Sequence, residues 1–382
     1  MLAAVATGWF LTLGLRYFVP AVLPQVTATF RIDNATAGLA VTVIWAAYAL
    51  MQFPAGALAD RLGTRTLLAA SLVLAGASTV ALGLAPTVSA FLGACGLFGL
   101  ATGLYGPSRG IALAATFPDN DGIAIGATLA AGSVGSAALP FAASVLVAGI
   151  GWRLAIALAA PLFTVTALAL WRALPPIDGA TATERSPREA LGAVGRAIRT
   201  RAVAVAVSAV TLMLFSMQGL TAFLPTYLVT AKGLEGTTAA GLFALLFLSG
   251  AVFQFLAGRA ADRYGDRPVL LATTLVGGPA VGALPFVSGL IPLAGLTVLL
   301  GSRLAINSVS NAYVVAVLPE RVRGAAWGFL RTSYFLLGAT GSVVVGTLAD
   351  AGRFDEAYLL LAGLTALAAL LYTALPSRAA AA

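Results

Sequence analysis

Four arginines lie inside long apolar stretches of this 382-residue chain: Arg16, Arg109, Arg303 and Arg331. An arginine at bilayer depth costs about 2.5 to 3.5 kcal/mol even on the lenient insertion scale, and it usually faces a wet cavity or a partner. The 14 Asp and Glu residues all lie in predicted loops or at predicted helix ends. Because no acid accompanies these arginines, a bound anion is one group that would compensate them.

Several polar residues follow Arg303 in the sequence. Asn307 and Asn311 follow it at i+4 and i+8, so a helix would carry Arg303, Asn307 and Asn311 on one face. Ser310 lies beside them. A planar guanidinium beside two amides can bind a carboxylate or phosphate bidentately. The same stripe would also be suited to joining two helices, and both interpretations stay open.

Arg16 is followed by two prolines at helical spacing. Pro20 lacks the N–H group that would bond to the Arg16 carbonyl, and Pro24 does the same to residue 20. We expect the helix to be bent or loosened beside the guanidinium, which suits a ligand site. The alternative is an arginine that snorkels or pairs with a polar neighbour for structural reasons.

Other polar and aromatic residues in the middle of apolar stretches are weaker candidates, because each type more often packs than binds. Gln52 and Gln254 rank higher among them since they occupy equivalent positions in a repeat described below. The substrate-binding candidates added from this group are Tyr17, Tyr48, Gln218 and Gln254; its other members are Trp45, Gln52, Tyr105 and Tyr334.

The bulk composition indicates a polytopic membrane protein. Hydrophobic residues make up 60% of the chain and charged residues only 9%, against about 25% in soluble domains. The net charge of +8 comes from arginines in loops, so topology explains it and no nucleic-acid partner is expected. With no histidine and one cysteine, the chain offers neither an imidazole ligand nor a Cys-based metal site, and we expect no metal or cofactor.

A ten-residue segment occurs twice. Residues 56–65 and 258–267 match at an offset of 202, and extending both copies back by four residues makes nine of fourteen positions identical. We interpret each copy as a tight hairpin in which Gly63 supplies the turn, Asp60 ends a helix, and Arg61 and Arg65 hold the loop in the cytoplasm. Since Leu23-Pro24 and Leu224-Pro225 keep nearly the same offset, a six-helix unit is duplicated.

The predicted fold is therefore an all-α integral membrane protein with twelve transmembrane helices in two pseudo-symmetric six-helix bundles. We place the first bundle at residues 1–174, a cytoplasmic linker at 175–200 and the second bundle at 201–382. Helix 1 is expected at Leu2–Phe30, a turn at Gly151 separates helices 5 and 6, and helices 10 and 11 end at Leu318 and Asp350. Fourteen basic residues in one set of loops against four in the other place both termini in the cytoplasm, with the protein in the plasma membrane.

The repeated segment resembles the signature loop of the major facilitator superfamily, found between helices 2 and 3 and again between helices 8 and 9. Arg16 with Pro24, and the run Gly99–Ser108, look like the organophosphate:phosphate antiporters and related organic anion symporters. The chain departs from that branch at Met217-Gln218, where phosphate-ester members carry a second arginine, and it has no evident membrane-embedded carboxylate.

The resemblance implies alternating access, with the acid of the signature loop holding the cytoplasmic ends together in one state. We hypothesise that Asp60 and Asp262 form breakable ties with arginines near those ends; end-of-helix snorkelling is the alternative. The residues assigned to this gate are Asp60, Arg61, Arg65, Arg109, Asp262, Arg263, Arg267 and Arg331, together with Glu320.

The function expected is transport and not catalysis. The first reading is a secondary transporter that moves a small organic or inorganic anion by exchange, symport or facilitated diffusion. The second is a proton-coupled efflux antiporter for neutral or lipophilic drugs, and the third is a membrane sensor or scaffold that does not transport. The expected partners are a small-molecule substrate, a possible coupling ion and the lipid bilayer, with the protein acting as a monomer.

Overall fold

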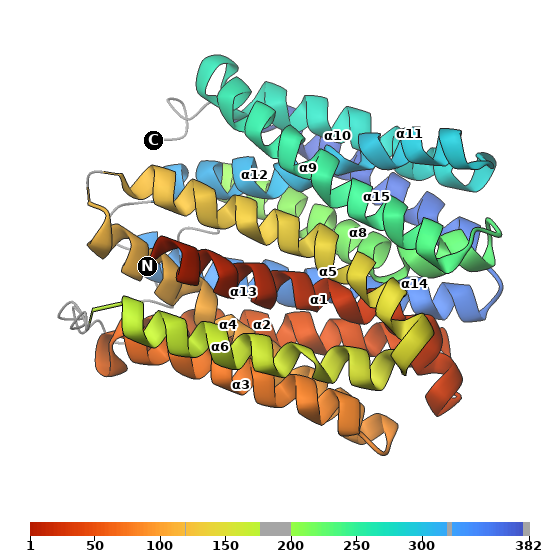
Figure 1. The fold of residues 1–382 in the computed structure, drawn as a ribbon. Coiled ribbons are helices and arrows are strands. Elements are labelled where there is room, and N and C mark those ends of the chain that lie inside the picture. Colours follow the sequence, from red (N-terminus) through yellow and green to blue (C-terminus); the bar gives the residue numbers. More distant parts are fainter. Residues whose placement is uncertain (119, 176–199, 319–322, 377–382) are drawn as a thin grey trace. The chain divides into compact units, whose positions relative to one another are not determined.

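The computed structural model describes residues 1–118, 120–175, 200–318 and 323–376, and in this part of the chain every regular element is helical (Figure 1). Grouping by proximity gives two compact units, the first with α1 to α6 and Glu235–Ala244, the second with the remaining helices. The elements are α1 (Leu2–Phe30), α2 (Asn34–Leu62), α3 (Thr64–Leu84), α4 (Val88–Thr116), α5 (Asp121–Ala157), α6 (Ala159–Ala173), α8 (Arg201–Thr230), α9 (Gly236–Tyr264), α10 (Asp266–Ala283), the 3₁₀ helix η1 (Leu284–Phe286), α11 (Leu290–Gly301), α12 (Leu304–Val317), α13 (Arg323–Ala339), α14 (Gly341–Asp350) and α15 (Phe354–Thr373).

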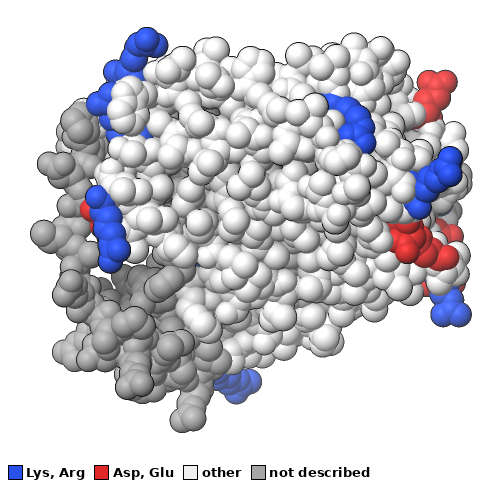
Figure 2. All heavy atoms as spheres, turned by 90° about the horizontal axis from the view of Figure 1, so that it is seen from below, with Lys and Arg blue, Asp and Glu red and all other residues white. Residues whose placement is uncertain are grey.

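The predicted membrane architecture is confirmed. Within the described residues, eleven helical stretches are long and apolar enough to cross a bilayer, and Ala159–Ala173 is a shorter apolar helix. Gly151 interrupts α5 with φ 74° and ψ 158°, so the turn predicted there exists and the sixth span begins just after it. Figure 2 shows charged side chains toward two ends of the face in view and uncharged side chains over most of the remainder. The predicted linker falls almost wholly on 176–199, outside the described residues, so the domain boundaries remain a prediction.

Small residues let the helices of each unit approach closely. In the first unit α1 packs along α5 (Figure 1), and a Cβ atom added at Gly14 would lie 2.5 Å from the Gly135 carbonyl oxygen. In the second unit α8 packs on α14, where a Cβ added at Gly341 would collide with the Phe215 carbonyl oxygen. Backbones this close gain dispersion contacts that larger side chains would prevent.

The two copies of the repeated segment adopt the same backbone turn. Gly63 has φ 76° and ψ 148°, and its equivalent Gly265 has φ 87° and ψ 165°. Each residue ends one helix and precedes the first residue of the next. The predicted role of Gly63 is therefore confirmed, and its copy makes the same turn.

Gly63→Ala and Gly265→Ala are each expected to lower the free energy of unfolding by about 1 to 3 kcal/mol. A side chain at positive φ with extended ψ is strained, so the loss comes from backbone conformation. Thermal unfolding of the purified protein measures it. Gly56→Ala and Gly258→Ala are matched controls, because an added Cβ meets nothing within 4 Å there. Equal losses at all four positions would contradict a role for the turn.

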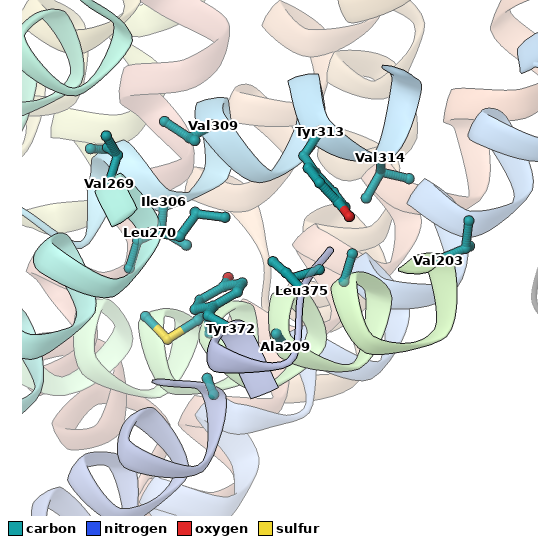
Figure 3. Packing of buried hydrophobic residues seen from close by; sticks show 14 of the residues in the cluster. Val203, Ala209, Val269, Leu270, Ile306, Val309, Tyr313, Val314, Tyr372 and Leu375 are labelled. Carbon is teal, nitrogen blue, oxygen red and sulfur yellow. The ribbon is translucent and has the colours of Figure 1, made fainter. Parts of the chain in front are cut away.

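The apolar core of the second unit gathers around α12 and the end of α15. Ile306, Val309 and Tyr313 of α12 lie in the same cluster as Tyr372 and Leu375 (Figure 3). The Tyr372 hydroxyl lies 3.1 Å from Ser310 Oγ, which satisfies a polar atom inside apolar surroundings. The Ser310–Tyr372 contact thus joins α12 to the last turn of α15.

Two of the predicted spans are present, and each is interrupted by a short turn. Helix 10 consists of α11 and α12, separated by a 3₁₀-type turn in which the N–H groups of Ser302 and Arg303 bond to the Leu299 and Leu300 carbonyl oxygens. Helix 11 consists of α13 and α14, separated at Thr340. A 3₁₀ turn advances about 120° per residue instead of 100°, so side chains before and after it no longer share a face.

Candidate functional site

Arg16 lies in a cluster of aromatic rings inside the first unit. Its side chain is 1% exposed, and its Cζ lies 4.0 Å from the ring centre of Tyr48, 5.0 Å from Trp45 and 5.4 Å from Trp9. The Nε–H group donates to the Thr12 carbonyl oxygen at 3.2 Å. The negative faces of aromatic rings thus stabilise this buried positive charge.

Tyr17 and Tyr48, both predicted to bind substrate, belong to this cluster. The Tyr17 ring lies 5.7 Å from that of Trp45, and Trp45 lies 5.7 Å from Tyr48 in an edge-to-face arrangement. The structure therefore brings Arg16, Tyr17 and Tyr48 together from α1 and α2. Their role as a substrate site stays a prediction.

A second arginine approaches the same cluster through Trp9. Arg109 Cζ lies 4.1 Å from the Trp9 ring centre, and Tyr105 stacks on Trp9 at 6.3 Å. The Tyr105 hydroxyl donates to the Val5 carbonyl oxygen at 2.8 Å, which fixes α4 against α1. Sequence reasoning assigned Arg109 to the gate and missed Trp9, although spacing of seven residues between Trp9 and Arg16 puts both on one helix face.

Helix 1 is not broken where the two prolines were expected to bend or loosen it. Helix α1 continues from Leu2 to Phe30 with Pro20 and Pro24 inside it. Neighbouring helices hold such prolines in place, because packing along α5 outweighs the lost backbone bonds. Arg16 therefore projects from a continuous helix.

Arg303 is bound by hydroxyl groups within the second unit. Its side chain is 3% exposed, and its two terminal nitrogens donate to Thr365 Oγ1 at 2.7 Å and Ser216 Oγ at 2.6 Å. Both hydroxyls donate in turn to the Leu361 carbonyl oxygen, which leaves their lone pairs for the guanidinium. In the described structure, hydroxyl dipoles from α8 and α15 thus stabilise this charge.

Two members of the predicted polar stripe on helix 10, Arg303 and Asn311, bond to different helices. Arg303 turns toward α8 and α15, whereas Asn311 Oδ1 accepts a hydrogen bond from the Tyr334 hydroxyl of α13 at 3.0 Å. The Asn307 side chain lies outside the described residues, so its predicted role stays a prediction.

Gln52 and Gln254 make equivalent contacts in the two units. Gln52 Nε2 donates to the Gly103 carbonyl oxygen at 3.3 Å, joining α2 to α4, and Gln254 Nε2 donates to the Leu304 carbonyl oxygen at 3.4 Å, joining α9 to α12. Both contacts join neighbouring helices, and the predicted binding role of Gln254 stays a prediction. Gln218 is 3% exposed in α8.

Six of the predicted gate residues lie at the helix ends formed by the repeated segment, whereas Arg109 lies in α4 and Arg331 in α13. Asp60 is partly buried and Asp262 exposed, while Arg61, Arg263 and Arg267 are exposed. Arg65 Cζ lies 4.3 Å from the Trp171 ring centre, and Arg331 Cζ lies 5.6 Å from that of Phe335. Glu320 lies outside the described residues. The gate remains a prediction.

Known proteins resemble this chain over most of its length. The family model described as Major Facilitator Superfamily matches residues 5–253 and 236–381. The uncharacterised MFS-type transporter YfnC of Bacillus subtilis is 34% identical over 134 residues, which cover 35% of this chain and 32% of that protein. The multi-drug resistance efflux pump PmrA of Streptococcus pneumoniae is 28% identical over 124 residues, or 32% of this chain and 31% of the pump. Each match thus spans about a third of the relative.

The fold has solved counterparts. The crystal structure of the nucleoside transporter NupG aligns with 98% of this chain and 98% of its own, with a TM-score of 0.77 and 15% sequence identity. At this identity the likeness shows the fold alone.

Proposed function

Because this chain belongs to the Major Facilitator Superfamily, whose members are membrane transporters and not enzymes, we propose that it carries a small organic anion across the membrane by alternating access. We also propose that the chain belongs to the branch it resembles in sequence, that of the organophosphate:phosphate antiporters and organic anion symporters. Exchange, symport and facilitated diffusion are all compatible with it. The observation that carries it is the charge of Arg16, buried among Trp9, Trp45 and Tyr48.

The arrangement around Arg16 suits an anion with an apolar part. An aromatic ring engages the face of a guanidinium, whereas a carboxylate or phosphate binds the N–H groups at its edge. Both contacts can therefore act on one side chain. The rings of Tyr17 and Trp45 supply apolar surface next to the charge.

A second candidate is efflux of neutral or lipophilic drugs. Its support is the name of PmrA, a multi-drug efflux pump that matches about a third of this chain, together with the aromatic residues themselves. Large aromatic surfaces bind apolar compounds without needing a charge. In that case Arg16 would serve structure and not recognition.

The deciding experiment uses purified protein in proteoliposomes. We expect uptake of radiolabelled carboxylates or phosphate esters that is saturable and competed by other anions. Drug extrusion instead predicts removal of a lipophilic dye with no competition by anions. If neither class moves while the protein binds a ligand in a thermal-shift screen, the chain is a sensor or scaffold and the transport proposal fails.

A further inference from the structure

The outer face of α9 changes from apolar to basic near its end. Leu248, Val252 and Leu256 are 50%, 58% and 53% exposed, and they recur at spacings of four residues. Arg259 and Arg263 continue the same face and are also exposed. One exposed stripe thus joins a lipid-type surface to two positive charges.

Aromatic rings hold both arginines of the stripe. Arg259 Cζ lies 4.3 Å from the ring centre of Phe255, and Arg263 Cζ lies 5.4 Å from that of Tyr264. These rings are themselves 58% and 65% exposed, so they are surface groups and not part of the core. Restricting the guanidinium groups in this way lowers the entropy lost on binding an anion.

The first repeat lacks this arrangement although it carries the same loop. At the offset of 202, Arg259 corresponds to Ala57 and Tyr264 corresponds to Leu62. Arg263 corresponds to Arg61, which is shared. The shared loop therefore does not account for Arg259, and the extra charge belongs to the second repeat.

The length of α9 places these charges at headgroup depth. The helix has 29 residues, or about 43 Å at a rise of 1.5 Å per residue, whereas the hydrocarbon core is about 30 Å thick. The last turn, with Arg263 and Tyr264, thus projects beyond the core when the apolar stripe lies within it. Tyrosine is typical of this interfacial level.

We propose that the end of α9 binds one anionic phospholipid, with its phosphate on Arg259 and Arg263 and an acyl chain along Leu256, Val252 and Leu248. Arg267 is exposed at the start of α10 and adds positive charge to the site. Asp262, next to Arg263 in α9, is also exposed and reduces the net positive charge there. Arginine suits a phosphate because its planar fork donates two parallel hydrogen bonds. The site is independent of the transported substrate.

The test compares lipid binding by Arg259→Gln with the unmodified protein in nanodiscs. Nanodiscs of phosphatidylcholine with phosphatidylglycerol are the probe, and native mass spectrometry counts phosphatidylglycerol molecules retained after release. We expect binding about fivefold weaker for Arg259→Gln. Phe255→Leu keeps the apolar surface but loses the ring, and we expect an intermediate loss. Ala57→Arg in the first repeat is expected to add retained lipid.

Arg61→Gln is the matched control, since it removes an equivalent exposed arginine outside the stripe. Equal retention by Arg259→Gln and the unmodified protein would overturn the proposal. So would equal loss in Arg61→Gln and Arg259→Gln, which would indicate a general charge effect. Inorganic phosphate that displaces the lipid at millimolar concentration would instead mark a site for free anions. Monodisperse elution of every variant shows that the fold is intact.

Discussion

Arg16→Ala is expected to reduce the initial rate of anion uptake about 100-fold. A bidentate bond from a guanidinium to a carboxylate is lost, and α1 carries no other charged residue. Arg16→Lys keeps the charge but not the planar fork, so we expect a loss of about tenfold. Uptake of labelled carboxylates or phosphate esters into proteoliposomes measures both effects.

The control for this experiment is Arg31→Asn, at the C-cap of the same helix. Arg31 is exposed and has φ 54°, a left-handed conformation that asparagine tolerates. Its charge is therefore removed without straining the chain. Normal anion uptake by Arg16→Ala would defeat the anion proposal, whereas normal dye extrusion by the same variant would support the drug efflux candidate.

The helical scaffold was predictable because its signals are local. Apolar stretches of bilayer length set the helices, so the first helix was placed at Leu2–Phe30 as observed. Glycine was the signal at the turns, since Gly63 and Gly151 adopt positive φ where the chain reverses. The contact between Arg16 and Tyr48 was partly predictable from the sequence, because both are atypical residues in the middle of apolar helices.

The partners of Arg303 were not predictable from sequence. Ser216 and Thr365 lie 87 and 62 residues away from it, and a single hydroxyl in an apolar helix has no distinctive pattern. The break at Ser302–Arg303 was also missed, since apolar residues on both sides of it indicated one span. Helical periodicity placed Arg303 and Asn311 on one face, whereas their hydrogen bonds join them to different helices.

Removing both hydroxyl partners of Arg303 is expected to destabilise the protein strongly. In Ser216→Ala with Thr365→Val, a guanidinium that is 3% exposed loses the two acceptors of its terminal nitrogens. Leaving a buried charged group unsatisfied costs about 3 kcal/mol or more. We expect a lower thermal midpoint in detergent, and weaker association of α8 with α15, measured by faster proteolysis.

Arg303→Met in the same double variant distinguishes structure from substrate recognition. An apolar side chain of similar length needs no acceptor, so we expect it to restore most of the lost stability. If Arg303 only joins α8 to α15, the rescued protein also transports anions at the original rate. Restored stability with uptake still abolished would instead return Arg303 to the substrate site, because the charge itself would then be required.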